Sequence, residues 1–332
     1  MKSISKNDLK LFLREMASEY SVIAPIKYEN GSVSYGTFKD DEEIDLLQKT
    51  ASPKFTLFPH TQQILKLKQN QIFLADNSQK RFVFGIRSCD MSAINYMDTF
   101  MRRDGFEDPH YVNRRNKTIF CVVECNNLLS PSCFCTLIGV KPYMESGFDL
   151  KAVELSETFV FECSEKYQDL LQSKFFREVT QNEKEELNNL RTQIKQNFQE
   201  TLNLKELSEK VILAQENREI YEEMALRCIE CGSCIYVCPS CTCFNVYDLM
   251  EKGEPTRYRT WDACLHEGFQ REASGHNPRP TRGSRLKRRV EHKLLYDPKR
   301  FSMYGCVGCG RCQDSCPVNL GMLDIISHML SQ

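Results

Sequence analysis

Two runs of cysteines constrain this chain more than any other feature of its sequence. CIECGSCIYVCP at 228–239 and CVGCGRCQDSCP at 306–317 both follow the pattern C-x2-C-x2-C-x3-C-P. This pattern holds [4Fe–4S] clusters, and in two-cluster proteins the fourth cysteine of each run binds the cluster of the other run. The proline after that fourth cysteine ends the local turn and leads the chain away.

The crossover between the runs predicts the ligands of two clusters. The first cluster is expected on Cys228, Cys231, Cys234 and Cys316, and the second on Cys306, Cys309, Cys312 and Cys238. Small ferredoxins keep such runs close together, whereas here residues 239–305 lie between them. That segment has room for several helices, so we expect a helical ferredoxin module.

Three other interpretations of the cysteines are weaker. Structural zinc sites use two C-x2-C pairs that a longer loop separates, and neither run has that form. Cys234, Cys238 and Cys241 show the C-x3-C-x2-C spacing of a radical S-adenosylmethionine cluster, but they share ligands with a complete ferredoxin run. Disulfides are rare in a reducing compartment, where clustered cysteines indicate metal or redox chemistry.

Length and charge narrow the class of protein further. The chain has 332 residues, enough for about two domains, and 44 basic residues balance 45 acidic ones. This balance argues against nucleic acid or an anionic membrane as a partner. The start, MKSISKNDLK, lacks the apolar core of a secretory signal, and we find no run of 18 apolar residues. A cytoplasmic protein without a membrane span is therefore expected.

The N-terminal part has the pattern of an α/β domain. An amphipathic helix is expected within 5–20, with Leu9, Phe12, Leu13 and Met16 on one face. The apolar runs at 81–86 and 118–123 predict strands buried on both faces, and 91–101 has helical spacing.

Segment composition then gives the domain organisation. Residues 181–226 are polar, without Pro or Gly, and predict one or two helices with an apolar stripe formed by Leu187, Leu190, Ile194 and Phe198. The expected organisation is an α/β domain with a cysteine site (1–180), a helical connector (181–226) and an α-helical, ferredoxin-like domain with two [4Fe–4S] clusters (227–332).

Four N-terminal cysteines predict a third iron–sulfur cluster. Cys89 and Cys125 follow the two buried strands, and Cys133 and Cys135 lie in the next loop. Because the carboxyl ends of parallel neighbouring strands meet where open α/β sheets bind ligands, these four thiols are expected to face one place. Asp90 is a substitute ligand, and the alternative is that the four are ordinary buried thiols.

The remaining cysteines have less definite roles. Cys121, inside a strand, and Cys163, in a strand-like run, are expected to be small apolar side chains of the core. Cys241, Cys243 and Cys264 lie near one cluster run, where they either shield and tune the cluster or join a further site.

The basic stretch 279–289 holds six positive charges and is either a solvated face, or a surface that neutralises clusters or docks an acidic partner. His276 is a further hydrogen-bonding group in that region.

The chain resembles a family of iron–sulfur subunits. The resemblance rests on PSCTCFNVYD (239–248), RTWDAC (259–264), ASGHNPRPTR (273–282) and GCVGCGRCQDSCPVNL (305–320), and on shorter N-terminal motifs such as GIRSCD (85–90) and VECNN (123–127). The family contains the β subunit of cytosolic NAD(P)-linked nickel–iron hydrogenases (sulfhydrogenases) and the iron–sulfur subunit of anaerobic sulfite reductase. Ser274 departs from the glycine of similar proteins.

This resemblance implies an electron-transfer subunit. Its partners would be a subunit that binds FAD and NAD(P)H, and a catalytic subunit, with the hydrogenase type favoured over the sirohaem sulfite reductase type. We find no G-x-G-x-x-G after a strand, no P-loop and no G-x-S-x-G in the sequence, so no catalytic residue and no nucleotide site is expected here. A flavin on another subunit must convert hydride transfer into single electrons. A self-contained oxidoreductase at the N-terminal cysteines and a zinc scaffold are the remaining alternatives.

Overall fold

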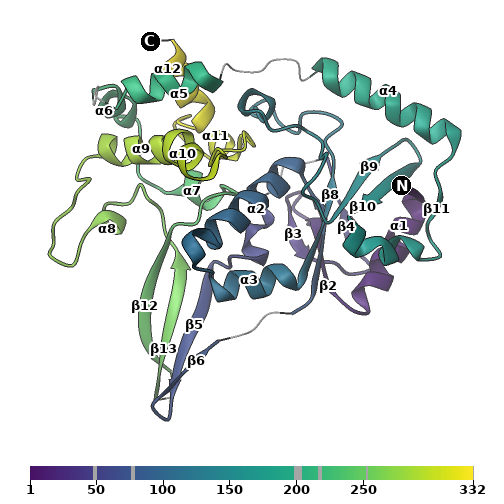
Figure 1. Ribbon diagram of the computed structural model, residues 1–332, viewed down its shortest axis with the longest axis horizontal. Coiled ribbons are helices and arrows are strands. Elements are labelled where there is room, and N and C mark those ends of the chain that lie inside the picture. Colours follow the sequence, from purple (N-terminus) through teal and green to yellow (C-terminus); the bar gives the residue numbers. More distant parts are fainter. Residues whose placement is uncertain (48–50, 76–78, 198–203, 216–218, 252, 332) are drawn as a thin grey trace.

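The computed structural model describes residues 1–47, 51–75, 79–197, 204–215, 219–251 and 253–331. Within these residues, a large mixed sheet with its covering helices forms one part of the molecule and a group of shorter helices forms another (Figure 1). A small second sheet projects between them (Figure 1). The expected α/β character of the N-terminal part is confirmed.

The large sheet has nine strands in the described part of the chain, and β4 pairs beside β2 outside the main order β11-β1-β10-β9-β8-β7-β2-β3. Its strands are β1 (Lys2–Ser5), β2 (Ser21–Lys27), β3 (Val33–Thr37), β4 (Glu43–Ile44), β7 (Arg81–Ile86), β8 (Thr118–Val123), β9 (Leu150–Glu154), β10 (Thr158–Cys163) and β11 (Arg177–Glu178). The central strands β2, β7, β8 and β9 run parallel, and the outer pairs are antiparallel. The predicted strands at 81–86 and 118–123 are thus parallel neighbours.

Helices bury both faces of this sheet, which explains why β7 and β8 are apolar throughout. Successive residues of β7 alternate between two cores: Phe82 packs with Phe12 of α1 (Lys6–Ala17), and Val83 packs on the opposite face with residues of α2 (Ser88–Met101) and α3 (Pro109–Asn116). The helices predicted within 5–20 and over 91–101 are therefore confirmed. Cys121 is fully buried in the α1-side core, as expected for an apolar role.

The second sheet combines strands from the two ends of the chain. Its order is β12 (Phe244–Glu251), β13 (Glu254–Trp261), β5 (Thr61–Lys68) and β6 (Gln71–Leu74), all antiparallel. The sequence predicted a helical module with room for several helices between the cysteine runs, and it did not predict the strands β12 and β13. A turn with Gly253 at a φ of +82° joins these two strands.

The rest of the chain is mostly helical. Its helices are α4 (Gln181–Asn197), α5 (Leu204–Leu213), α6 (Glu219–Ala225), α7 (Ser233–Tyr236), α8 (Glu267–Gln270), α9 (Arg282–Glu291), a π-helix (His292–Tyr296), α10 (Asp297–Phe301), α11 (Arg311–Asp314) and α12 (Met322–Leu330). Of these, α5, α6, α9, the π-helix and α12 pack around one apolar core. Single turns of 3₁₀ helix occur at Pro53–Thr56, Arg103–Gly105 and Thr136–Ile138, and a longer one at Glu165–Gln172.

The connector divides between the two parts. On α4, Leu187 and Leu190 pack against the large sheet, whereas Leu207 of α5 and Tyr221 of α6 are buried with α9 and α12. Ile194 of the predicted stripe is buried, and Phe198 lies outside the described residues. The division into three domains stays a prediction.

Candidate metal centres

The first candidate site is a pocket lined by cysteines from both runs. Its thiols are Cys228, Cys231, Cys234 and Cys316. The site forms because α7 begins directly after Gly232, whose φ of +73° turns the chain so tightly that a Cβ would lie 2.8 Å from the ring of His266. The predicted crossover is therefore present as an arrangement of side chains, with Cys316 reaching the loop near residue 230.

Backbone amides point at the sulfurs of this site. The Glu230 amide donates to the Cys228 sulfur at 3.4 Å, and the Leu320 amide donates to the Cys316 sulfur at 3.2 Å. Burial, together with nearby thiols that include Cys228 and Cys316, raises the pKa of the Cys234 thiol to about 11. Cys231 is exposed, so this site reaches the molecular surface.

The second candidate site is built on the other run by the same local geometry. Gly310, with a φ of +70°, precedes α11 as Gly232 precedes α7. Burial, together with the nearby thiols of Cys312 and Cys238, raises the pKa of Cys306 to about 12 and that of Cys309 to about 11. Cys238, from the first run, thus faces the cysteines of the second run, and the Met322 amide donates to the Cys312 sulfur at 3.3 Å.

The third candidate site is a pocket where the N-terminal domain meets the second run. It is lined by all four predicted thiols, Cys89, Cys125, Cys133 and Cys135, together with Gly308, Cys309 and Arg311. Cys89 lies in the first turn of α2, directly after β7, and Cys125 lies just beyond β8. The parallel pairing of β7 and β8 therefore brings these two thiols to one sheet edge, as the sequence predicted.

Asp90 is not among the residues that line this third pocket. Its carboxylate pairs with Arg311 at 2.8–2.9 Å and accepts from the Arg87 amide at 3.3 Å. Asp90 and Arg311 are both almost completely buried, at 1% and 6% exposed. Asp90 thus anchors the second cysteine run to α2, and its role as a substitute ligand stays a prediction.

The three sites fit a large anionic group held by thiolates. A four-iron cluster with four cysteine ligands carries about two negative charges, so cations and N–H donors should surround it. Lys293 of the π-helix is buried and donates to the Cys238 sulfur at 3.5 Å. Arg289 is 2% exposed, and its Nε and one terminal nitrogen have no hydrogen-bond partner in the described part of the protein. The thiols of Cys234 and Cys312 face this guanidinium and raise its pKa, against the effect of burial.

No three His, Cys, Asp or Glu side chains of the described ranges meet closely enough to hold one metal ion. The thiols of the first and third sites instead line pockets.

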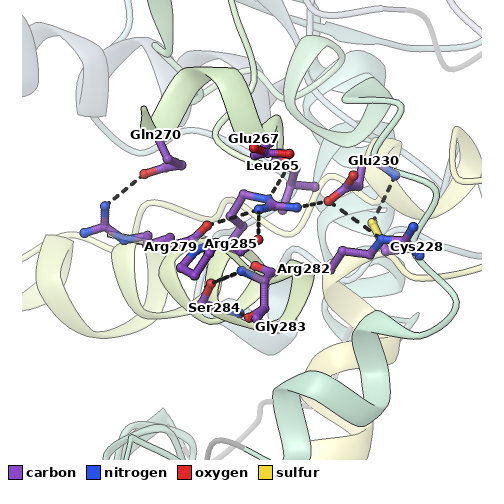
Figure 2. A network of polar contacts seen from close by, with 12 residues as sticks. Cys228, Glu230, Leu265, Glu267, Gln270, Arg279, Arg282, Gly283, Ser284 and Arg285 are labelled. Carbon is purple, nitrogen blue, oxygen red and sulfur yellow. Dashed lines mark hydrogen bonds and ion pairs between the residues drawn. The ribbon is translucent and has the colours of Figure 1, made fainter. Parts of the chain in front are cut away.

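The basic stretch is largely structural. Figure 2 shows Arg285 at the centre of a polar network: it donates to the carbonyls of Leu265, Arg279 and Pro280 and pairs with Glu230. Glu230 lies in the loop between Cys228 and Cys231, so this buried arginine holds the first cysteine run in place. The expectation of a purely solvated face is wrong for Arg285 and Arg289, which are 3% and 2% exposed. His276 is exposed and lies outside the candidate sites.

Sequence reasoning missed several residues of these sites. Lys54 and Lys293 are buried beside thiols, yet each lies in a segment without a motif. The spacing of Arg285, Arg289 and Lys293, four residues apart, was the available signal, because it places all three on one helical face.

Comparisons with known proteins agree with the motifs. A 4Fe-4S dicluster domain matches residues 227–320. The chain is 28% identical over 294 residues to sulfhydrogenase 2 subunit beta of Pyrococcus furiosus, a match that covers 87% of this chain and 86% of that subunit. Together these matches support the iron–sulfur subunit family that the sequence resembles. The helices of the described residues include none with the length and apolar character needed to cross a membrane.

Proposed function

We propose that this chain, as a member of the iron–sulfur subunit family, relays single electrons through three [4Fe–4S] clusters between two partner subunits. The ligands are those predicted above: the first cluster on the 228–234 run with Cys316, the second on the 306–312 run with Cys238, and the third on the N-terminal cysteines. The observation that carries the proposal is that cysteines from distant segments line common pockets, surrounded by buried cations and backbone donors.

The three sites lie in a row. Cys309, a ligand of the second cluster, also lines the pocket of the third. Cys312, another ligand of the second cluster, faces Cys234 of the first. The second cluster is therefore the middle one, and electrons pass from the third through the second to the first, or in reverse.

Both ends of this row open toward solvent. At one end Cys231 is exposed. At the other end Arg87 and Cys125 also line an open cleft of about 680 Å³, which is bordered by acidic residues of α4 such as Glu185 and Glu186. We infer that one partner docks at each end, close to a terminal cluster.

The chemistry of the partners follows from the way in which iron–sulfur clusters transfer electrons. Clusters exchange one electron at a time, whereas a nicotinamide gives a hydride, so a flavin subunit is the donor or acceptor. The catalytic partner is of the nickel–iron hydrogenase type, because the similar Pyrococcus subunit belongs to a sulfhydrogenase. The second candidate for the catalytic partner is a sirohaem sulfite reductase. It is supported by the similarity of the sequence motifs to those of the iron–sulfur subunit of that enzyme.

Anaerobic affinity purification of the tagged chain from its own cells tests the assembly. We expect a flavoprotein that oxidises NAD(P)H and a second protein containing nickel and iron to purify with it in fixed ratio. Sirohaem in place of nickel would support the alternative. A chain that purifies alone from such cells, or with neither a flavin nor a metal protein, would contradict the relay.

A further inference from the structure

A buried lysine lies on the one turn of π-helix in the described part of the chain. Lys293 is 6% exposed and is the second residue of that turn (His292–Tyr296), which continues α9. Turns of π-helix are rare in proteins and occur frequently at functional sites. The contacts of the Lys293 side chain therefore bear on the function of the chain.

The ammonium group of this lysine joins the two cysteine runs. It donates to the Cys238 sulfur at 3.5 Å and to the Ser240 hydroxyl at 3.1 Å, at the end of the first run. It also donates at 2.6 Å to the carbonyl of Gly305, which directly precedes Cys306 of the second run. The three donors of the ammonium thus have three acceptors, and one acceptor is the sulfur of a ligand assigned to the second cluster.

The surrounding backbone fixes this lysine in place. The Gly305 amide donates to the Lys293 carbonyl at 2.9 Å, so the same glycine binds both the backbone and the side chain of the lysine. A Cβ on Gly305 would lie 3.1 Å from the Cα of Lys293, which shows how closely the two segments approach. The Ser240 hydroxyl also donates to the Gly305 carbonyl, at 2.6 Å. The ammonium is therefore held at a fixed distance from the Cys238 sulfur.

The positive charge of Lys293 has no carboxylate partner among the described residues. Its oxygen acceptors are a hydroxyl and a carbonyl, and Asp297, one turn further along, contacts the ring of His292 at 3.2 Å instead. A buried charge is costly unless an anion lies nearby. A cluster bound by four thiolates carries about two negative charges and supplies such an anion.

The buried arginine near the third site differs in this respect. Arg311 forms an ion pair with the buried Asp90 at 2.8–2.9 Å, so the carboxylate compensates its charge. Lys293 instead directs an uncompensated charge at a ligand of the second cluster. Its effect should therefore be larger on the second cluster than on the third.

We propose that Lys293 is a positioning residue that raises the reduction potential of the second cluster through its hydrogen bond to Cys238. Reduction adds one electron and so one negative charge, and no bond breaks and no proton moves. A fixed ammonium stabilises that added charge, since net charge and hydrogen bonds to the sulfurs set the potential of such clusters. This inference rests on the proposed relay, in which the second cluster is the middle one. Lys293 then favours the electron at the centre of the row.

Redox titration followed by electron paramagnetic resonance (EPR) tests this role on the full chain, purified without oxygen. The signal of the second cluster is the one that Cys309→Ser loses. Lys293→Met should keep the iron content and shift the midpoint potential of that signal by about 59 mV or more to more negative values, which is a tenfold change in the equilibrium constant for one electron. The other two signals should stay close to their wild-type potentials.

Two further variants separate the charge from the packing of the side chain. Lys293→Arg keeps the charge and should restore the potential of the second signal toward the wild-type value. Lys151→Met is the matched control: Lys151 is also a buried lysine, but it donates to the Met144 carbonyl at 2.8 Å and pairs with Glu162 at 3.0 Å. This control should leave the potential of the second signal unchanged.

An unchanged potential of the second signal in Lys293→Met, or an equal shift of all three signals, would overturn the role of Lys293. If the methionine variant loses iron, Lys293→Gln takes its place, because it keeps a hydrogen-bond donor without the charge, and the same shift is expected. Loss of iron from both variants would show a structural role and would also overturn the proposal. These results leave the three-cluster relay intact, whereas a wild type without any iron would contradict the relay itself.

Discussion

Cys316 belongs to the second cysteine run by sequence but lines the pocket of the first. Its sulfur accepts a hydrogen bond from the Leu320 amide, and the chain beyond Pro317 leads away into α12. Because three ligands of each cluster come from one short loop, the fourth cysteine is the residue that joins the two runs.

Cys316→Ala should therefore remove the first cluster. We expect the variant to lose the same EPR signal that Cys231→Ala loses, and to keep the signal that Cys309→Ala loses. The spectra of the three variants, all recorded on dithionite-reduced protein, are compared directly with one another. If the Cys316 variant instead matched the Cys309 variant, the crossover would be wrong.

A second residue-scale prediction concerns Gly308, between Cys306 and Cys309. Its φ is +62°, its carbonyl accepts from the Phe134 amide at 2.8 Å, and a Cβ there would lie 2.5 Å from the Cα of Cys135. Gly308→Ala should push the loop of the third site away and lower the iron content. Gly253→Ala is the control, since it has a φ of +82° with open space around it, and only backbone strain of about 1 kcal/mol is expected. Equal iron in both variants would contradict the close approach.

Sequence alone could identify the site residues whose position follows from their spacing along the chain. Ligand spacing predicted the pockets of the first and third sites because local turns and parallel strand ends determine where a thiol lies. Lys54 and Lys293 follow no such rule, since their place beside the thiols depends on how distant elements pack. The buried role of Arg285 was missed for the same reason, because a basic residue in a basic stretch carries no sign of burial.

At the scale of elements, Glu183 joins α4 to one edge of the large sheet. Its carboxylate, 7% exposed, accepts from Ser3 of β1 at 2.5 Å, Thr158 of β10 at 2.8 Å, and Arg177 of β11 at 2.9 Å. Burial alone would raise the pKa of Glu183, but hydrogen bonds from Arg177, Ser3, Thr180 and Thr158 outweigh it, so the pKa lies well below its usual range.

This carboxylate predicts a dependence of stability on acid pH. A lowered folded-state pKa contributes stability above the unfolded value of about 4.3, which is lost as pH falls further toward the folded pKa. Glu183→Gln should lower the free energy of unfolding at pH 7 by about 2 kcal/mol, and the difference from the wild type should shrink below about pH 4. Urea unfolding at pH 7 and at a pH below about 4 measures this free energy for the variant and the wild type. Glu178→Gln is the control: its exposed side chain pairs with Lys2, and solvent screens that pair, so this variant should change the free energy of unfolding far less. An effect of Glu183→Gln that is the same at pH 7 and at acid pH would refute the argument.

Helices and strands could be predicted where the apolar residues form a continuous run or repeat with the spacing of a helix. The buried strands β7 and β8 and helices α1 and α2 follow directly from apolar runs and helical spacing. The hairpin of β12 and β13 was missed, because its exposed residues such as Leu249 and Met250 give no clear alternation, and its pairing with β5 depends on a segment far away in the sequence. Long-range pairing of this kind has no local signal.

At the scale of the whole molecule, the row of sites predicts that the middle cluster controls the flow of electrons. Cys309→Ser should remove the second cluster and leave the first and third in place. Electrons supplied through the flavin partner should then reduce only the cluster nearest to that partner. Freeze-quench EPR of the reconstituted complex measures which cluster is reduced and how fast. Rapid reduction of both remaining clusters would show that the sites do not act in series.

The central claim is that the thiols of this chain hold iron–sulfur clusters, and metal and sulfide analysis of protein purified without oxygen tests it most directly. The account predicts a brown protein with at least about twelve iron atoms per chain for three four-iron clusters, and a similar amount of acid-labile sulfide. A colourless protein with stoichiometric zinc and no labile sulfide would contradict it.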